Sequence, residues 1–349
     1  MTPMTNWGIT VRMVFSLVTA FLICLAFVPW LIQHFADRDV GQAIRREGVK
    51  AHRSKAGIPT MGGLAIILGV AASTFVWTKQ STLVNIALVS LLFLGFLGFI
   101  DDYLKVSKKN SRGLPPRGKL FGQILFSSLL GIYLLNGGDS SYGKIYVPIL
   151  QPAFDINFAY VGFVIIVIVG CSNAVNLTDG LDGLAAGVVG VVTLCYAGIA
   201  YVAGHALGAN HLNIPPVPGA GELAIFCAAI VGACIGFLWF NSHPASIFMG
   251  DTGSLALGGA IGTVSVLIHQ EVLLVIIGGI FVIEAVSVII QVTSFKLRRK
   301  RVFLMSPIHH HFELAGWPES KVVIRFWIIT IMFALTGLSL LGLNAVVNG

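Results

Sequence analysis

Residues 82–106 read "TLVNIALVSLLFLGFLGFIDDYLKV". The first part of this stretch, residues 82–100, contains no charged side chain, and it has the length that a helix needs to cross the hydrocarbon core of a membrane. It ends at two adjacent aspartates, Asp101 and Asp102, and Lys105 follows one helical turn later. The pattern predicts a membrane-spanning helix that carries acidic side chains at one end.

The rest of the chain repeats this apolar pattern. Of its 349 residues, 56% are hydrophobic and only 11% are charged, whereas soluble domains carry about 25% charged residues. We therefore exclude a soluble protein and predict an all-α, polytopic bundle of about ten transmembrane helices, with one membrane-embedded domain over residues 1–349. The predicted spans are 11–33, 58–78, 82–100, 119–136, 157–175, 184–203, 222–240, 253–269, 271–293 and 323–345.

The distribution of lysine and arginine predicts the orientation of this bundle. Six of the 22 basic residues lie in 34–57, six in 101–119 and seven in 294–325. Because cytoplasmic loops are enriched in Lys and Arg, we expect these segments in the cytoplasm and both termini in the periplasm. The net charge of +7 then faces anionic headgroups of membrane lipid rather than nucleic acid. On the outer side we expect a short hairpin in 137–156 and an irregular loop in 204–221.

A second acidic motif, "NLTDGLDG", lies on the same predicted side. Asn176, Asp179 and Asp182 recur at a spacing of three, which predicts that they line one face of a helix or tight turn. An acid at membrane depth is costly unless it is paired, solvated or bound to a cation. We therefore interpret this motif and the Asp101–Asp102 pair as parts of one polar cavity. A solvated helix end with a local salt bridge, and plain turn chemistry, are the alternatives.

The stretch "FMGDTGS" contributes a third acidic motif to this side. Asp251 or Thr252 is placed to cap the following helix. Helix N-termini attract phosphate, and Mg²⁺ prefers carboxylate oxygens together with substrate phosphates. Phe248 offers a flat platform for a base. The alternatives are capping alone and an ordinary core aromatic.

Three histidines follow the last basic run, in "MSPIHHHFELA" at 305–315. Consecutive side chains point in different directions, so His309, His310 and His311 do not suit one metal ion. We expect a loop in which they donate to an anion, with idle loop histidines as the alternative. Glu284, the main acid inside a span, is expected to pair near Gln291. Carboxylates, cations and a membrane-surface site together favour phosphoryl transfer.

Five motifs occur in order along nearly the whole chain. They are "IPTMGG" at 58–63, "DDYLKV" at 101–106, "NAVNLTDGLDGLAAG" at 173–187, "FMGDTGSLALGG" at 248–259 and "PIHHHFELAGW" at 307–317. Together they resemble the motifs of the phospho-N-acetylmuramoyl-pentapeptide transferases, within the polyprenyl-phosphate N-acetylhexosamine-1-phosphate transferases. The resemblance implies a Mg²⁺-dependent enzyme of the bacterial cytoplasmic membrane, with its active site facing the cytoplasm. It would convert UDP-N-acetylmuramoyl-pentapeptide and undecaprenyl phosphate into lipid I and UMP, and would form a homodimer.

The same resemblance implies roles for individual residues. Asp251 would bind the metal, Asp101 and Asp102 would activate or position the lipid phosphate, and His309 and His310 would contact phosphate or nucleotide. The further substrate-binding residues would be Lys55, Thr60, Asn176, Asp179 and Gln291 around the diphosphate and sugar, Lys105 near the phosphates, Asp182, Asn241 and Phe248 around uridine, and His311 beside the other histidines.

Two other functions fit parts of the pattern. One is a sister transferase that moves N-acetylglucosamine 1-phosphate to a polyprenyl phosphate. The other is a transporter, which would carry ionisable groups near helix centres, whereas most acids here lie near one surface. For the transferase we favour direct attack by the lipid phosphate over a covalent aspartyl intermediate, because that phosphate is already an anionic nucleophile.

Overall fold

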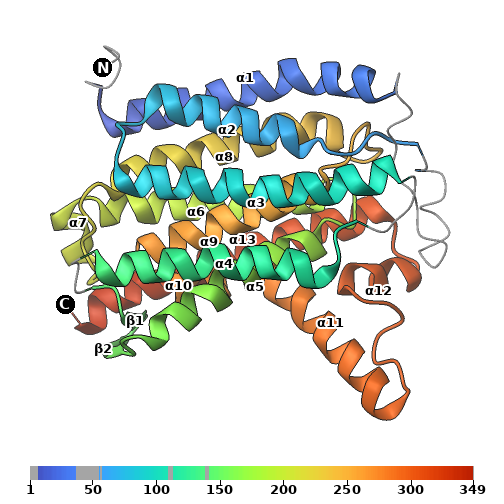
Figure 1. The fold of residues 1–349 in the computed structure, drawn as a ribbon. Helices are drawn as coiled ribbons and strands as arrows, with labels where there is room; N and C mark the ends of the chain where they lie inside the picture. The colour runs from blue at the N-terminus through green and yellow to red at the C-terminus, as the bar shows by residue number, and fades with distance from the viewer. Residues whose placement is uncertain (1–6, 37–54, 56, 109–112, 138–140, 349) are drawn as a thin grey trace.

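The computed structural model describes residues 7–36, 55, 57–108, 113–137 and 141–348, and these residues are mainly helical (Figure 1). Most basic residues of the segment 34–57 therefore lie outside the described residues. The helices are α1 (Ile9–Ala36), α2 (Gly63–Trp77), α3 (Thr82–Ser107), α4 (Pro116–Asn136), α5 (Ala159–Thr178), α6 (Leu184–Ala203), α7 (Ala206–His211), α8 (Ala220–Asn241), α9 (Gly250–Leu267), α10 (Glu271–Ile277), α11 (Gly279–Arg298), α12 (Ile308–Leu314) and α13 (Glu319–Asn348), and the strands are β1 (Lys144–Val147) and β2 (Leu150–Asp155).

Eight helices in the described part of the chain are long and apolar enough to cross a membrane, namely α1, α3, α4, α5, α6, α8, α11 and α13. Helix α2 is apolar but has 15 residues. The prediction of a polytopic helical membrane protein is confirmed, and every predicted span coincides with one or two helices. That ten segments cross the membrane, with both ends of the chain outside, stays a prediction.

Helices α8 and α9 lie at the centre of the bundle. Helix α8 packs against α1, α6 and α2, and α9 packs against α3 and α5. Both are rich in glycine and alanine and are buried along nearly their whole length. Small residues let helix backbones approach closely within a membrane, where dispersion contacts between helices replace the hydrophobic effect.

The predicted span 271–293 is interrupted. Gly278 ends α10 and begins α11, with φ −87° and ψ 24° outside the helical range. Gly279 packs on the ring of Phe333, because an added Cβ would lie 2.8 Å from the ring atoms. Adjacent glycines at a tight contact are a recognised cause of a sharp helix bend. Beyond this break α11 leans away from the bundle (Figure 1).

The two outward segments differ in how well they were predicted. Strands β1 and β2 pair antiparallel with a register irregularity, which confirms the hairpin in 137–156. The segment 204–221 is not simply irregular, because it contains the short helix α7. The hairpin lies at the end of the bundle where α1 begins and α13 ends (Figure 1).

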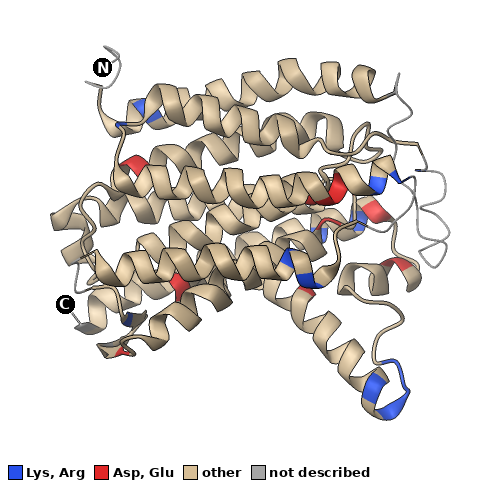
Figure 2. Cartoon of the chain, in the orientation of Figure 1, with Lys and Arg blue, Asp and Glu red and all other residues tan. Residues whose placement is uncertain are grey.

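Charged residues concentrate at the two ends of the bundle (Figure 2). At the end where α1 begins, Arg12 and Glu222 form a two-pronged salt bridge, with nitrogen–oxygen distances of 2.6 and 2.7 Å. Glu222 also accepts a hydrogen bond from the backbone N–H of Lys79 at 2.6 Å. This pair ties α1 to α8 at the end opposite the acidic motifs. At that opposite end, acidic and basic residues gather where α3 ends and α4 and α13 begin (Figure 2).

Candidate active site

Three carboxylates from two helices meet at one end of the bundle. Asp101 and Asp102 lie in the last turns of α3, and Asp251 lies in the first turn of α9. One oxygen atom from each lies within 4.8 Å of the others. Asp101 and Asp102 are only 2% and 3% exposed. We call these three residues the carboxylate cluster.

Close packing of α3 on α9 brings the carboxylate cluster together. Gly98 faces the backbone of Asp251, because a Cβ at this glycine would collide with the Asp251 carbonyl group. Asp102 Oδ2 then accepts two hydrogen bonds from Thr252, from the backbone N–H at 2.9 Å and from the hydroxyl at 2.8 Å. Asp102 therefore holds the two helices together as well as adding charge to the cluster.

Gly250 also constrains the site. Its φ of +76° favours glycine, and an added Cβ would lie 2.5 Å from Asp102 Oδ2 and 3.1 Å from Thr60 Oγ1. The predicted side-chain cap at Asp251 is wrong, because α9 begins after Met249 without a side-chain cap. The Asp251 carboxylate instead faces the acids of α3.

Two lysines neutralise most of the charge of the cluster. Lys105 Nζ lies 2.5 Å from Asp101 Oδ2, 3.2 Å from Asp251 Oδ2 and 3.4 Å from Asp102 Oδ1. Lys119 Nζ, from the start of α4, contacts Asp251 Oδ2 and lies 3.5 Å from Asp101 Oδ1. Lys105 lies four residues after Asp101, and this spacing of one helical turn allows their contact.

The end of α5 supplies two more polar groups. Asn176 Nδ2 donates a hydrogen bond to Asp251 Oδ1 at 2.9 Å. Asp179 follows the last residue of α5. Burial, with the nearby negative charges of Asp251 and Asp102, raises the pKa of Asp179 to about 8. A cation at the cluster would oppose this shift, because it would favour the ionised carboxylate.

Asp182 lies in a separate network with Lys55. Lys55 Nζ lies 2.6 Å from Asp182 Oδ1 and 2.6 Å from Glu319 Oε1. Asp182 Oδ2 lies 3.1 Å from His243 Nδ1 and accepts a hydrogen bond from the backbone N–H of Ala245 at 3.1 Å. Asp182 is 3% exposed, so its carboxylate is well ordered by these partners.

The prediction that Asp182 shares a face with Asn176 and Asp179 is therefore wrong. The chain turns after Asp179, and α6 begins only at Leu184. The turn sends Asp182 toward Lys55 while Asn176 reaches Asp251. Asn241 holds this turn, because its Oδ1 accepts a hydrogen bond from the backbone N–H of residue 183 at 3.0 Å.

The three histidines lie on the short helix α12 and not in a loop as predicted. Their side chains diverge, as expected for consecutive residues. His309 Nδ1 lies 3.0 Å from Glu284 Oε1, and both side chains are fully buried. His310 Nδ1 lies 2.7 Å from Glu313 Oε2. His311 Nδ1 accepts a hydrogen bond from the backbone N–H of residue 304 at 3.2 Å.

The partner of Glu284 also differs from the prediction, because it is His309 rather than a group near Gln291. His309 packs on Gly180, within the motif "NLTDGLDG", where any Cβ would collide with the imidazole ring. The Nε2 atom of His309 is buried. This histidine therefore connects α11 and α12 to the turn after α5.

Two other predicted substrate-binding residues are engaged by backbone groups. The Gln291 amide accepts hydrogen bonds from the N–H groups of Val302 and Phe303, and donates one to the Phe303 carbonyl at 2.9 Å. Phe248 is half-buried, and its backbone pairs with the segment 58–63 through two hydrogen bonds of 2.8 Å. These contacts brace the loops around the site.

The carboxylate cluster fits a hard divalent cation. It supplies several carboxylate oxygens in a small space, which is the kind of donor that Mg²⁺ and Ca²⁺ prefer. The described residues around it also include Asn176, whose amide N–H orients Asp251, and two lysines that suit phosphate groups. A softer metal would favour imidazole or thiolate ligands.

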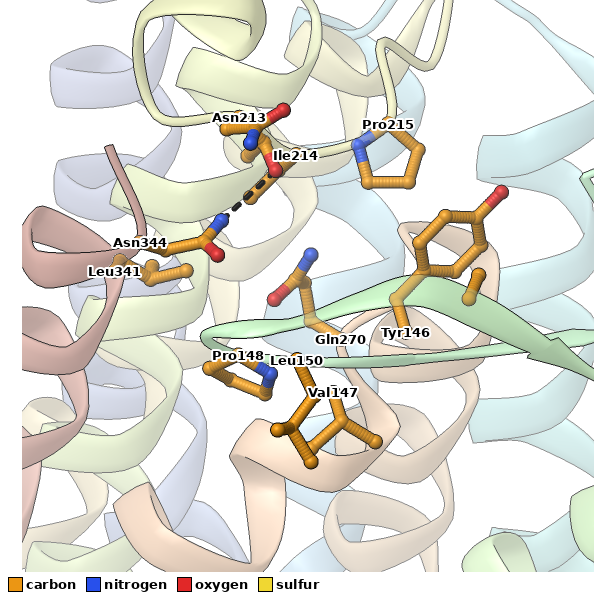
Figure 3. Close-up of a pocket in the computed structure, with 11 residues that line it drawn as sticks. Tyr146, Val147, Pro148, Leu150, Asn213, Ile214, Pro215, Gln270, Leu341 and Asn344 are labelled. Carbon is orange, nitrogen blue, oxygen red and sulfur yellow. Dashed lines mark hydrogen bonds between the residues drawn. The ribbon is translucent and has the colours of Figure 1, made fainter. Parts of the chain in front are cut away.

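A small cavity lies elsewhere, next to the hairpin (Figure 3). Gln270, Tyr146 and Asn344 point into it, and Pro148 and Pro215 form part of its wall. The lining residues include no acidic, basic or histidine side chain. The cavity therefore lacks the charged groups that phosphoryl transfer needs, and the carboxylate cluster is the stronger candidate for the active site.

Comparisons with known proteins identify the family of the chain. A model described as "Glycosyl transferase family 4" matches residues 83–269, and a "Phospho-N-acetylmuramoyl-pentapeptide-transferase signature 1" matches residues 55–67. The chain is 50% identical to the phospho-N-acetylmuramoyl-pentapeptide-transferase of Desulfotalea psychrophila over 340 residues, which are 96% of this chain and 94% of that protein. It is 49% identical to the protein of that name from Pelobacter propionicus over 339 residues, which cover 95% and 93% of the two chains.

The chain belongs to the phospho-N-acetylmuramoyl-pentapeptide-transferase family. The family assignment made from the five motifs is thereby confirmed. The match in 83–269 contains the whole carboxylate cluster, and the signature in 55–67 contains Lys55 and Thr60.

Sequence reasoning did not assign site roles to Lys119, Glu319 and His243. Lys119 was assigned only to the basic segment 101–119. It also begins the predicted span 119–136, and the preceding predicted span, 82–100, ends next to Asp101 and Asp102. Glu319 and His243 lie far from Asp182 in the sequence, at 137 and 61 positions after it. A charged residue at the start of a span, on the same predicted side as the acids, is the signal that could have indicated Lys119 and Glu319.

Proposed function

We propose that the chain transfers phospho-N-acetylmuramoyl-pentapeptide from UDP-N-acetylmuramoyl-pentapeptide to undecaprenyl phosphate, which gives lipid I and UMP. The relatives that carry the transferase name match nearly the full length of the chain. The observation that carries the proposal at the level of chemistry is the carboxylate cluster with its two lysines, held at one end of a membrane bundle.

The reaction joins a lipid phosphate to a sugar phosphate. An oxygen of undecaprenyl phosphate forms a bond to the phosphorus atom that bears the sugar, and the bond from that phosphorus to the oxygen of UMP breaks. We propose direct attack, with Asp101 and Asp102 positioning the lipid phosphate. Lys105 and Lys119 would stabilise the negative charge that moves onto the leaving UMP.

The cofactor in this proposal is Mg²⁺, held by Asp251 with the neighbouring acids of α3. Bound there, the ion would neutralise phosphate oxygens and orient the two substrates. Asn176 would keep the Asp251 carboxylate in place, since it donates to Oδ1 and leaves Oδ2 turned toward the lysines.

The remaining residues would bind the nucleotide sugar. Lys55, Asp179 and Thr60 are proposed to line the diphosphate and sugar region, and Asp182 and Phe248 the uridine region. Asn241 and Gln291 would act by holding the loops that carry these groups. His310 and His311 are proposed to face phosphate or nucleotide, and His309 to hold α12 against the turn at Gly180.

For the setting of the enzyme, we propose one functional unit over residues 1–349 in the bacterial cytoplasmic membrane, acting as a homodimer. The carboxylate cluster would face the cytoplasm, where nucleotide sugars are made. The excess of basic residues in the segments at this end supports that orientation.

The test is release of UMP by the purified protein in detergent. UMP should appear only when UDP-N-acetylmuramoyl-pentapeptide and undecaprenyl phosphate are both present with Mg²⁺. UDP-N-acetylglucosamine in place of the muramoyl substrate should give none. Faster turnover with UDP-N-acetylglucosamine would assign the chain to the sister activity, and exchange of labelled UMP without lipid phosphate would point to a covalent intermediate.

A further inference from the structure

Glu319, the first residue of α13, contacts two proposed substrate-binding residues at once. Its Oε1 lies 2.6 Å from Lys55 Nζ and accepts a hydrogen bond from the backbone N–H of Asp182 at 2.8 Å. Lys55 Nζ in turn lies 2.6 Å from Asp182 Oδ1. The three residues form a closed triangle that joins the segment before α2, the turn after α5 and the start of α13.

The contacts within this triangle are hydrogen bonds that involve ionised groups. The Lys55 side chain is 14% exposed and the Glu319 side chain 10% exposed, so water screens them only in part. Hydrogen bonds between ionised groups are shorter and about twice as strong as those between neutral groups. A lysine side chain is long and flexible, and two carboxylates on its ammonium group hold it in one place.

The outer side of the triangle is closed by His243. Its Nδ1 lies 3.1 Å from Asp182 Oδ2 and 3.5 Å from Glu319 Oε2. His243 is more exposed than Lys55, Asp182 and Glu319, with 43% of its side chain open to solvent. Glu319 therefore lies behind Lys55 and Asp182, with its carboxylate oriented by groups of the protein itself.

We propose that Glu319 is a positioning residue for the nucleotide-sugar substrate. It keeps the Lys55 ammonium and the Asp182 turn in the arrangement that the substrate meets, and it does not touch the reacting atoms. The inference rests on the proposed function, in which Lys55 and Asp182 bind the nucleotide sugar. Within the described part of the chain, no hydrogen bond or ion pair joins Glu319 to the carboxylate cluster.

This arrangement predicts a selective kinetic effect. Removal of the Glu319 carboxylate should weaken binding of the nucleotide sugar, while the groups that act on the lipid phosphate stay in place. The substitution Glu319→Ala deletes both contacts of Oε1, and Glu319→Gln keeps an oxygen for the Asp182 N–H but removes the charge that holds Lys55. The exposed neighbour Ser320 offers a matched control as Ser320→Ala.

The experiment measures UMP release as a function of each substrate. For Glu319→Ala we expect the KM for the nucleotide sugar to rise about tenfold or more, because this variant loses both the ion pair with Lys55 and the hydrogen bond from the Asp182 N–H. Glu319→Gln should give a rise of about threefold to fivefold on the same basis. The kcat and the KM for undecaprenyl phosphate should stay within about twofold to threefold of the wild-type values, and Ser320→Ala should match wild type.

A second measurement separates positioning from a merely structural role. The affinity for UMP, measured by calorimetry without turnover, should fall in parallel with the KM effect. In a Lys55→Met background, Glu319→Gln should weaken UMP binding by less than about twofold, because this variant removes only the contact with Lys55, which is already absent there.

Three results would overturn the inference. They are an unchanged KM for the nucleotide sugar in both Glu319 variants, a loss of kcat and melting temperature without a KM effect, and additive effects of Lys55→Met and Glu319→Gln on UMP binding. Failure of the proposed function can be distinguished from these three results, because the wild-type protein itself would then release no UMP from the two substrates.

Discussion

The substitution Asp251→Asn is the sharpest test of the carboxylate cluster. Asp251 Oδ2 faces two ammonium groups, at 3.2 Å from Lys105 Nζ and in contact with Lys119 Nζ, and Oδ1 accepts a hydrogen bond from Asn176 at 2.9 Å. Asparagine keeps the shape and the Oδ1 acceptor. It removes the negative charge, and its NH₂ group then faces the two lysines.

The size of the effect follows from these contacts. Loss of one preorganised electrostatic partner in an active site reduces kcat by about 10²–10³, equivalent to about 2.7–4 kcal/mol. Asp251 is also the proposed metal ligand, so we expect at least the upper end of this range. The assay is UMP release at saturating concentrations of both substrates, over a series of Mg²⁺ concentrations.

The matched control is Asp155→Asn. Asp155 ends β2 in the hairpin, at the other end of the bundle, and is exposed. The same chemical change there should leave kcat within about twofold, as expected for a surface position. If Asp251→Asn folds, shown by an unchanged melting temperature, and still turns over at more than a third of the wild-type rate, Asp251 is not the metal ligand.

Three further predictions concern packing and the metal. Glu222→Ala leaves the buried guanidinium of Arg12 without its carboxylate, which should destabilise the protein by about 3–5 kcal/mol and lower its melting temperature, with an unchanged temperature as the contrary result. Gly180→Ala pushes a methyl group into His309 and should lower the free energy of unfolding by about 1–3 kcal/mol. Gly170→Ala, whose methyl group meets open space, should not lower it, and equal melting temperatures of the two variants would contradict this packing. Removal of divalent ions with EDTA should abolish UMP release and Mg²⁺ should restore it; full activity in EDTA would exclude a metal role.

The sequence predicted the elements of this fold better than their details. Long apolar runs reveal membrane-spanning helices because the backbone N–H and C=O groups must all be hydrogen-bonded within the protein in a membrane, and a helix satisfies this requirement. The break at Gly278 was missed because two glycines inside an apolar run do not by themselves interrupt a helix. It arises from the contact of Gly279 with Phe333, which lies on a different helix.

For the site, too, the sequence predicted which motifs meet better than it predicted the contacts of individual residues. The charge asymmetry was enough to place the three acidic motifs on one side, and Asp101, Asp102 and Asp251 do meet. The different position of Asp182 depends on the turn between α5 and α6 and on contacts with distant residues. The pairing of Glu284 with His309 depends on how α12 packs, which periodicity within either segment does not reveal.

The charge balance at the cluster has a consequence for how the enzyme is loaded. Three carboxylates beside two ammonium groups leave one net negative charge. A divalent ion alone would therefore overshoot neutrality, and anionic phosphates arriving with it would restore the balance. In the proposed mechanism, metal affinity should accordingly be weaker in the resting enzyme than when a phosphate-bearing substrate is bound.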